Sequence, residues 1–584
     1  MAETAADALV EGLLKWNVEI VFGLPGDGIN GIMEALRTRR DRVRFVHVQH
    51  EEAAAFMACA YAKYTGRLGV CLATSGPGAL HLLNGLYDAK ADQAPVLAIT
   101  GQTFSDLKGS SFQQEVNLTA VFADVAGVNQ EIINPNQTPM LVDAACRHAL
   151  LHRGVSHLCF PVDYQEKKLD KNLSMHKRQG HTSAAWTPSA TVPPAGDLHR
   201  AAELLNGSFR PVLLVGKGAL GATAEVIEIA TKLGAPVVKA LLGKAVLPDD
   251  HPLTTGGIGL LGTRASETAM QECDGLLIVG SSFPYIEYLP KPGQASGVQI
   301  DDRPDRIGLR YPVEVGMIGD AKATLAALSP LIEPKQDRSW LEQAQKNMAE
   351  WNDLLKSRAS RDDVPMKPQR VAAELSELAA DDAILSVDSG TNTFWAAQHF
   401  KIRGRQMFSC SGLMASMANG LPYAIAAKIA YPERQSIAFV GDGGFMMLMC
   451  EFLTAVKERA PITVVVIKNG TLGQIKWEQM IFLGNPEYGC DLPEFDFAKF
   501  AEAAGGIGIA VREPAELRPA LESALAADRP ALVEVAVDPN EPIQVPSMSA
   551  KQSLHLAQAL AKGTPGGKQI ALTMFRNKLE DVFG

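Results

Sequence analysis

The stretch from Ser436 to Gly473 constrains the fold of this chain more than any other. It contains, in order, the apolar segment 437–440, the turn Gly441-Asp442-Gly443-Gly444, a helical segment from Phe445 to about Arg459, the apolar segment 462–467 and the turn Lys468-Asn469-Gly470-Thr471. In a parallel sheet, two strands joined by a helix place their carboxyl ends at the same edge, where such folds bind ligands. Although 469 − 442 = 27 positions separate Asp442 from Asn469, we expect the two side chains to meet in space.

The residue types in the two turns indicate a metal and a phosphate group. An Asp carboxylate, an Asn amide oxygen and a nearby main-chain carbonyl are hard oxygen donors, suited to a Mg²⁺ that also holds a diphosphate. We therefore expect Asp442, Asn469 and Thr471 to form the metal site. Three glycines, Gly441, Gly443 and Gly444, let the backbone approach the phosphates, toward which the following helix directs its positive N-terminus. Each piece alone is equally typical of an ordinary turn, and only the pair at this spacing is specific.

Length and composition limit the class of protein. A chain of 584 residues is too long for one core, so three or four domains are expected. A hydrophobic content of 47% with 21% charged residues predicts a soluble α/β protein, and a net charge of −10 without a basic block argues against a nucleic-acid partner. The eight cysteines are scattered and no signal peptide precedes them, which favours reduced thiols in the cytoplasm. No apolar run approaches the ~20 residues that cross a bilayer.

Strand, turn and helix alternate along most of the chain, which predicts an α/β fold of three doubly wound parallel-sheet domains. We expect these domains at 1–180, 190–335 and 360–545, with a polar linker within 170–193 and a charged helical connector at about 337–361. The first and third blocks look like the same fold used twice, although no sequence repeat proves it. A C-terminal tail, 546–584, follows the third block.

The turns described above resemble the diphosphate-binding motif of thiamine-diphosphate enzymes, which is Gly-Asp-Gly followed a helix and a strand later by Asn-Asn. The first Asn of that motif is Lys468 here, whereas the second, the metal ligand of the family, is kept as Asn469. A second resemblance lies at His50-Glu51-Glu52, ahead of an alanine-rich helix. In the family's His-Glu-x-Ala-Ala pattern the Glu after the His bonds the aminopyrimidine ring, so the resemblance assigns this role to Glu51. Glu52 has no such match and is expected to be solvated.

Further cofactor contacts are implied by the same resemblance. Met417 matches the Met of a Gly-Leu-x-x-x-Met pattern that wedges the cofactor into a bent shape. The implied thiamine-diphosphate contacts are Gly26, Ser75, Gly390, Thr391, Ser416, Met417, Gly441, Gly443 and Gly444. The second block looks like the central domain of FAD-carrying members, with expected contacts at Gly216, Gly218, Gly259, Gly280, Phe283, Asp301 and Asp320.

Within the family, the chain is most similar to pyruvate oxidases and pyruvate:quinone dehydrogenases. The similarity is carried by 416–419, 283–285, 431–435 and 475–479. Candidates for the groups around the substrate are Phe112, Gln113 and Glu478. A simple decarboxylase would show His-His where Gln113-Gln114 stands, and is therefore disfavoured. The resemblance implies oxidative decarboxylation of pyruvate or another small 2-oxo acid, giving acetate or acetyl phosphate, with electrons passed to quinone or oxygen.

Two other functions remain open. In acetolactate synthase the same chemistry joins two 2-oxo acids and FAD is structural. Trp477-Glu478 is similar to its Trp-Glu pair, but the spacing from Leu472-Gly473 is one residue short. The other is a non-catalytic subunit, which has no need to keep Glu51 together with the metal site. In this family the first and third blocks of different subunits meet at the active site, which implies a homodimer or homotetramer.

The tail has a helical pattern after residue 567 that places Leu572, Phe575, Leu579 and Val582 on one face. Docking of this face on the same protein is the commoner outcome. The alternative is an amphipathic, peripheral contact with the inner face of the cell membrane.

Overall fold

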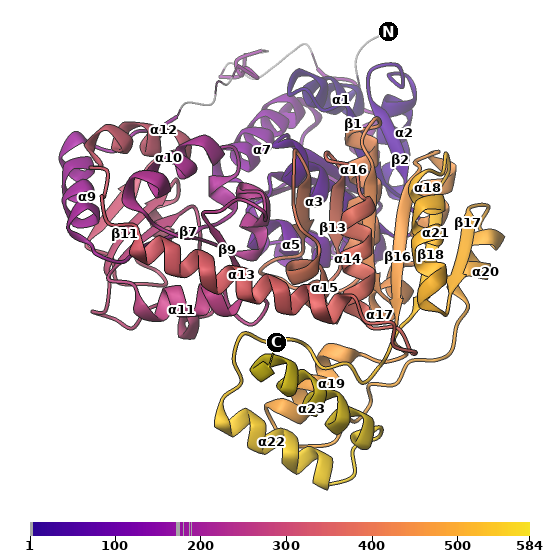
Figure 1. Cartoon of the computed structure of the whole chain (residues 1–584). Helices are drawn as coiled ribbons and strands as arrows, with labels where there is room; N and C mark the ends of the chain where they lie inside the picture. The colour runs from indigo at the N-terminus through magenta and orange to yellow at the C-terminus, as the bar shows by residue number, and fades with distance from the viewer. Residues whose placement is uncertain (1–3, 171–175, 179, 186, 188–189, 584) are drawn as a thin grey trace.

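Three six-stranded parallel sheets form the protein (Figure 1). The computed structural model describes residues 4–170, 176–178, 180–185, 187 and 190–583, with side chains described as far as Asn577. Helices cover both faces of each sheet, so the predicted α/β class with three doubly wound sheets is confirmed. The central strands are buried along their whole length, which explains their continuous apolar sequences.

The first sheet has the strand order β2-β1-β3-β4-β6-β5. Its strands are β1 (Ile20–Gly23), β2 (Arg44–His47), β3 (Gly69–Ala73), β4 (Val96–Gln102), β5 (Ala126–Glu131) and β6 (Val155–Pro161). Its helices are α1 (Ala5–Lys15), η1 (Asp27–Ile29), α2 (Asn30–Arg37), α3 (Glu51–Thr65), α4 (Pro77–His81), α5 (Leu83–Ala91), α6 (Leu118–Val121), η2 (Pro135–Gln137), α7 (Thr138–His152) and α8 (Val162–Gln165).

The second sheet has the order β12-β11-β10-β7-β8-β9. Its strands are β7 (Pro211–Val215), β8 (Val237–Lys239), β9 (Thr254–Gly257), β10 (Gly275–Val279), β11 (Ser296–Asp301) and β12 (Val315–Ile318). Its helices are α9 (Ala195–Gly207), η3 (Lys217–Ala219), α10 (Thr223–Leu233), η4 (Leu241–Val246), α11 (Arg264–Glu272), η5 (Ile286–Tyr288), η6 (Pro304–Arg306), α12 (Ala321–Leu328) and η7 (Ser329–Leu331). The long helix α13 (Ser339–Ala359) then leads to the third sheet (Figure 1).

The third sheet has the order β14-β13-β15-β16-β18-β17, which repeats the order of the first sheet strand for strand. Its strands are β13 (Ile384–Val387), β14 (Met407–Cys410), β15 (Ser436–Gly441), β16 (Ile462–Lys468), β17 (Ile507–Val511) and β18 (Ala531–Ala536). Its helices are α14 (Pro368–Leu378), α15 (Thr391–His399), α16 (Gly420–Ala430), α17 (Asp442–Leu448), α18 (Glu451–Lys457), α19 (Gly473–Ile481), α20 (Phe497–Ala503) and α21 (Pro514–Leu525). The expectation of one fold used twice is thereby confirmed.

The first and third sheets share one hydrophobic core. It forms where α3 packs against α16, because the small side chains of α3 let the two helices approach closely. Twelve of the fifteen residues of α3 are buried, and Cys59 Sγ on α3 lies 3.3 Å from the Tyr423 hydroxyl on α16. The positions of these two domains are therefore fixed relative to each other within one chain.

The tail forms two helices, α22 (Ala550–Ala561) and α23 (Gly567–Phe583), beside α19 at the bottom of the view (Figure 1). Leu556, Ala559 and Ile570 are buried against the third domain. Leu572 and Phe575, by contrast, are 69% and 64% exposed, so this part of the predicted apolar face points to solvent; the side chains of Leu579 and Val582 lie outside the described residues. Within the described chain, no helix combines the length and apolar character needed to cross a bilayer.

Candidate functional site

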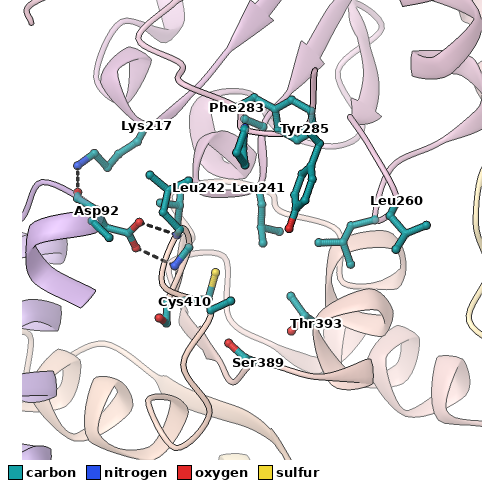
Figure 2. Close-up of a pocket in the computed structure, with 18 of the residues that line it drawn as sticks. Asp92, Lys217, Leu241, Leu242, Leu260, Phe283, Tyr285, Ser389, Thr393 and Cys410 are labelled. Carbon is teal, nitrogen blue, oxygen red and sulfur yellow. Dashed lines mark hydrogen bonds between the residues drawn. The ribbon is translucent and has the colours of Figure 1, made fainter. Parts of the chain in front are cut away.

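A cavity of about 780 Å³ lies between the second and third sheets (Figure 2). Its wall is built from the carboxyl ends of strands in both sheets, together with Asp92 and Arg153 from the first domain. Parallel sheets bind ligands at this edge, and the volume lies near the upper end of the ~300–1,000 Å³ range of small-molecule sites. One continuous space thus connects the predicted FAD and diphosphate regions.

The predicted metal residues meet at one end of this cavity. Strand β15 ends where α17 begins with Asp442, and its neighbour β16 ends just before Asn469. Asp442 accepts hydrogen bonds from the main-chain N–H of Gly443 at 2.9 Å and of Gly470 at 2.7 Å. Asn469 Oδ1 accepts one from the main-chain N–H of Thr471 at 3.0 Å. All of these residues except Gly470 line the cavity.

The charge of Asp442 indicates what this end of the cavity can hold. Its side chain is buried, and burial raises the pKa of its carboxyl to about 6 despite the N–H donors. Among the described residues no Lys or Arg forms an ion pair with Asp442, and Thr471 Oγ1 is buried without a hydrogen-bond partner. A buried carboxylate without a cation is costly unless one is supplied. The donor set therefore fits Mg²⁺.

The glycine-rich segment around Asp442 is helical, whereas the sequence predicted a turn there. The predicted turn is the first turn of α17, which begins at Asp442 rather than at Phe445. A Cβ at Gly444 would lie 2.5 Å from Asp388 Oδ2, and one at Gly443 would lie 2.8 Å from Leu472 Cδ2. Packing within the protein therefore requires glycine at both positions, in addition to any approach of phosphate. Gly441, Gly443 and Gly444 line the cavity, as do Gly390, Thr391 and Met417.

The second domain contributes the other end of the cavity. Gly216, Gly218, Gly280, Phe283, Asp301 and Asp320 all line it. A Cβ at Gly218 would lie 2.7 Å from Gly280 Cα. Glycine is therefore required in these turns because the two loops pass each other closely. Gly259 does not line the cavity, because the Phe283 ring lies against it. The Ser281 hydroxyl, which is buried without a partner, faces this end. Apolar walls and spare polar groups fit a flat aromatic cofactor such as FAD.

The first-domain candidates form a separate group that does not line the cavity. Glu51 is buried at the start of α3, and its carboxylate Oε2 lies 2.9 Å from His81 Nδ1. A Cβ at Gly78 would lie 2.9 Å from Glu51 Oε1, and one at Gly26 2.5 Å from Thr74, so the turns after β1 and β3 meet here. The same edge of the first sheet carries Ser75, Phe112 and Gln113. Ser75 Oγ donates a hydrogen bond to Gln114 Oε1 at 3.0 Å. The side chains of Phe112 and Gln113 are exposed.

One expectation from the sequence needs correction here. Glu52 is not simply solvated: its side chain is 24% exposed, and its carboxylate accepts a hydrogen bond from Asn84 Nδ2 at 2.6 Å. Ser416 does not line the cavity, and its hydroxyl accepts a hydrogen bond from Asn84 Nδ2 at 2.9 Å; its contact with the cofactor stays a prediction. Both hydrogen bonds come from Asn84, a polar side chain on α5 that no local motif marks.

Lys468 also points away from the cavity. Its ammonium donates to the Phe495 main-chain carbonyl at 2.6 Å and to Glu534 Oε1 at 3.2 Å. Glu534 is completely buried on β18 and is held as well by Arg512 at 2.6 Å. Lys468, which replaces the first Asn of the motif, therefore stabilises the contact between β16 and β18.

Lys468→Asn is expected to destabilise the fold by roughly 1–3 kcal/mol, because the buried Glu534 loses one of its two cations. Mg²⁺-dependent binding of thiamine diphosphate should be unchanged. Urea unfolding and a cofactor titration measure the two effects, and Lys499→Asn, at a residue that is 81% exposed, is the matched control. Lost cofactor affinity at unchanged stability would instead place Lys468 in the site.

Glu451 was not singled out from the sequence, yet it supports the segment that carries Glu51. It is completely buried on α18, and its Oε1 accepts the main-chain N–H groups of Gln49 and His50, each at 2.9 Å. Its Oε2 accepts the Thr454 hydroxyl at 2.7 Å. An acid between apolar neighbours in an amphipathic helix is the only sequence signal for this contact. Burial raises the pKa of Glu451 to about 7 despite these donors.

This raised pKa predicts a dependence of stability on pH. Because Glu451 binds its proton more tightly in the folded than in the unfolded protein, its stabilising contribution is full below about pH 4.5 and is lost as pH rises to about 7. The stability of wild type relative to Glu451→Gln should therefore fall by roughly 3 kcal/mol over this window. Urea unfolding between pH 5 and 8 tests this, with Glu522→Gln on the exposed face of α21 as control. Parallel curves for wild type and Glu451→Gln would contradict it.

Three family models match the sequence, and together they span most of it. Residues 3–121 match the N-terminal TPP binding domain of thiamine pyrophosphate enzymes, residues 198–328 the central domain, and residues 388–535 the C-terminal TPP binding domain.

Curated proteins similar to the chain differ in their described activities. A putative thiamine pyrophosphate-containing protein, YdaP, of Bacillus subtilis is 41% identical over all of both chains. A pyruvate oxidase of Lactiplantibacillus plantarum is 32% identical over 92% of this chain and 89% of its own. A probable acetolactate synthase large subunit of Methanocaldococcus jannaschii is 33% identical over 92% of each. Overall identity therefore does not distinguish the last two reactions.

Proposed function

Because this chain belongs to the thiamine pyrophosphate enzyme family, we propose that it decarboxylates pyruvate oxidatively, with thiamine diphosphate, Mg²⁺ and FAD as cofactors. The products are acetate or acetyl phosphate, and the electrons pass to quinone or oxygen. The single observation that carries this proposal is the continuous cavity. It would give a flavin bound by the second domain direct access to a cofactor held by Asp442, Asn469 and Thr471 in the third.

The residues of the chain have distinct tasks in this proposal. Bound thiamine diphosphate supplies the nucleophilic carbon and the electron sink, and FAD supplies the two-electron acceptor. Asp442, Asn469 and Thr471 hold the Mg²⁺ and with it the diphosphate. Glu51 holds a proton against the aminopyrimidine ring, and its hydrogen bond to His81 orients the carboxylate for this task.

The substrate pocket is assigned to residues from both groups. Glu478 lines the cavity from α19 and is hydrogen-bonded through Oε1 to Gln474 Nε2 at 2.8 Å. Phe112 and Gln113 are exposed in the first domain. We assign Glu478, Phe112 and Gln113 to the space around pyruvate, where they orient the substrate and exclude water.

The separation of the two groups of residues supports a proposal for the assembly. Glu51 does not line the cavity that contains Asp442, which supports a site that is completed by the first domain of a second copy of the chain. We therefore propose a homodimer as the smallest active unit, with a homotetramer as the larger form.

One observation weighs against acetolactate synthase, the rival reaction. Trp477, which together with Glu478 is similar to the Trp-Glu pair of the synthase, is only 2% exposed and lies on the buried side of α19, in the core of the third domain. It does not line the cavity, whereas Glu478 does. The pair thus divides between the core and the cavity, and only the Glu is available to a substrate.

The decisive experiment is anaerobic mixing of the purified protein with thiamine diphosphate, Mg²⁺, FAD and pyruvate while the flavin absorbance is followed. Rapid bleaching is expected, because electrons would reach FAD. A flavin that stays oxidised while acetolactate accumulates would establish the synthase instead. Failure of the protein to bind FAD would remove the redox step from the proposal.

For the tail, we propose that α22 and α23 mainly dock on their own chain, through Leu556, Ala559 and Ile570. The exposed Leu572 and Phe575 are the surface that a membrane would contact. Co-sedimentation with anionic lipid vesicles distinguishes the two roles, because a tail that only docks leaves the protein in the supernatant.

A further inference from the structure

Helix α5 presents a stripe of polar side chains to the segment that carries Met417. Asn84, Asp88 and Asp92 follow each other at intervals of four residues, with Asp92 as the C-terminal cap of α5. Side chains four residues apart lie on the same face of a helix. All three contact residues 411–418, which run from the end of β14 to the start of α16.

The two acids hold the first part of this segment. Asp92 Oδ2 accepts the main-chain N–H of Gly412 at 2.7 Å, and Asp92 Oδ1 accepts that of Leu413 at 2.8 Å; both bonds are visible beside Cys410 in Figure 2. Asp88 Oδ1 accepts the Ser411 hydroxyl at 2.8 Å. Three consecutive residues of the segment are therefore anchored to one helix of another domain.

Asn84 holds the later part of the segment. Its amide Nδ2 donates to Ser416 Oγ at 2.9 Å and to Glu52 Oε1 at 2.6 Å. Ser416 directly precedes Met417, and Glu52 directly follows Glu51. One side chain thus joins the segment that carries Met417 to the helix that carries Glu51.

The segment needs such anchors because its own backbone conformation is unfavourable. Ala415 and Ala418 have φ values of 51° and 74°, in a left-handed region that residues other than glycine rarely adopt. Leu413 and Met414 are 39% and 41% exposed, so little apolar burial holds the segment. Met417 lies between the two alanines and lines the cavity; a Cβ at Gly443 would lie 3.5 Å from its Cε.

The charge of Asp92 suits it to this task. The side chain is buried, and Lys63 Nζ lies 2.6 Å from Asp92 Oδ2. Burial alone would raise the pKa of Asp92, but the Lys63 ammonium and the N–H groups of Leu413 and Gly412 outweigh it and lower the pKa. An ionised acceptor makes stronger hydrogen bonds than a neutral one.

We propose that Asp92, Asp88 and Asn84 are positioning residues: they hold 411–418 in its strained conformation, fix Met417 at the cavity wall, and so determine the affinity for thiamine diphosphate. The inference rests on the proposed role of Met417 in holding this cofactor. It adds to that role three residues of the first domain, of which only Asp92 itself lines the cavity.

Asp92→Asn is the first test, because it keeps the shape of the side chain and removes one of the two acceptors. Hydrogen exchange of the cofactor-free protein, resolved to peptides, should be about 10-fold faster in 411–418 and unchanged in α16, which packs against α3. The dissociation constant for thiamine diphosphate with Mg²⁺, measured by tryptophan fluorescence, should rise by about 10-fold. Neither readout depends on the reaction catalysed, so a failed flavin assay would leave this result standing.

Asp124→Asn is the matched control, since this first-domain carboxylate is 72% exposed and contacts Lys90 and Tyr87 of its own domain. Ser411→Ala removes a single anchor and should act in the same direction more weakly, which keeps the test available if Asp92→Asn does not fold. Unchanged exchange in 411–418 would overturn the anchoring. Faster exchange with an unchanged dissociation constant would overturn the link to Met417 and the cofactor.

Discussion

Glu51→Gln is expected to lower kcat by about 10²- to 10⁴-fold, the usual contribution of a positioned general acid–base group. Gln keeps the size of the side chain and can still contact the aminopyrimidine ring, but it cannot hold or release the proton. The Mg²⁺-dependent affinity for thiamine diphosphate should stay close to that of wild type, because the diphosphate is held by residues of the third domain. Steady-state kinetics with pyruvate and a cofactor titration measure the two quantities separately.

The control for this variant is Glu34→Gln, at a residue whose side chain is 60% exposed on α2 and forms an ion pair with Arg37. It should retain full kcat and full affinity. Undiminished turnover of Glu51→Gln would refute the role given to Glu51. A loss of cofactor binding equal to the loss of turnover would make Glu51 a binding residue instead.

Asp442→Ala is expected to weaken Mg²⁺-dependent binding of thiamine diphosphate by about 100-fold or more, since a metal ligand should matter at least as much as the groups that orient it. The fold should be retained, because the substitution removes a buried carboxylate that has no cation partner among the described residues. Isothermal titration of the apo-protein with the cofactor, with and without Mg²⁺, measures the effect.

A matched Asp→Ala change at Asp305, whose side chain is 55% exposed in the second domain, should leave binding unchanged. If Asp442→Ala bound the cofactor as tightly as wild type, or if binding of wild type did not require a divalent cation, the metal site at the end of β15 would be refuted.

The sequence was most informative where the backbone alone decides the geometry. Asp442 and Asn469 meet because parallel strands must end at the same edge of a sheet, whatever the side chains around them. The predicted start of α17 was wrong by three residues. Glycine has a low helix propensity, but packing against Asp388 and Leu472 holds Gly443 and Gly444 in the first turn of the helix.

Contacts between domains could not be predicted from the sequence. Asn84 and Glu451 follow no motif, and their partners Ser416 and Gln49 lie 332 and 402 residues away in the chain. Such pairs can be identified only when it is known how the first and third sheets pack around their shared core. For the same reason Glu52 was expected to be solvated.

The separation of Glu51 from the cavity has a genetic consequence. If the catalytic unit takes Glu51 from one chain and Asp442 from another, a chain that lacks only Glu51 and a chain that lacks only Asp442 are each inactive alone. A mixed dimer of the two contains one site in which both defects coincide and one site that is wholly wild type. Two null alleles expressed in the same cell should therefore complement each other, because each mixed dimer would have about half of the activity of a wild-type dimer.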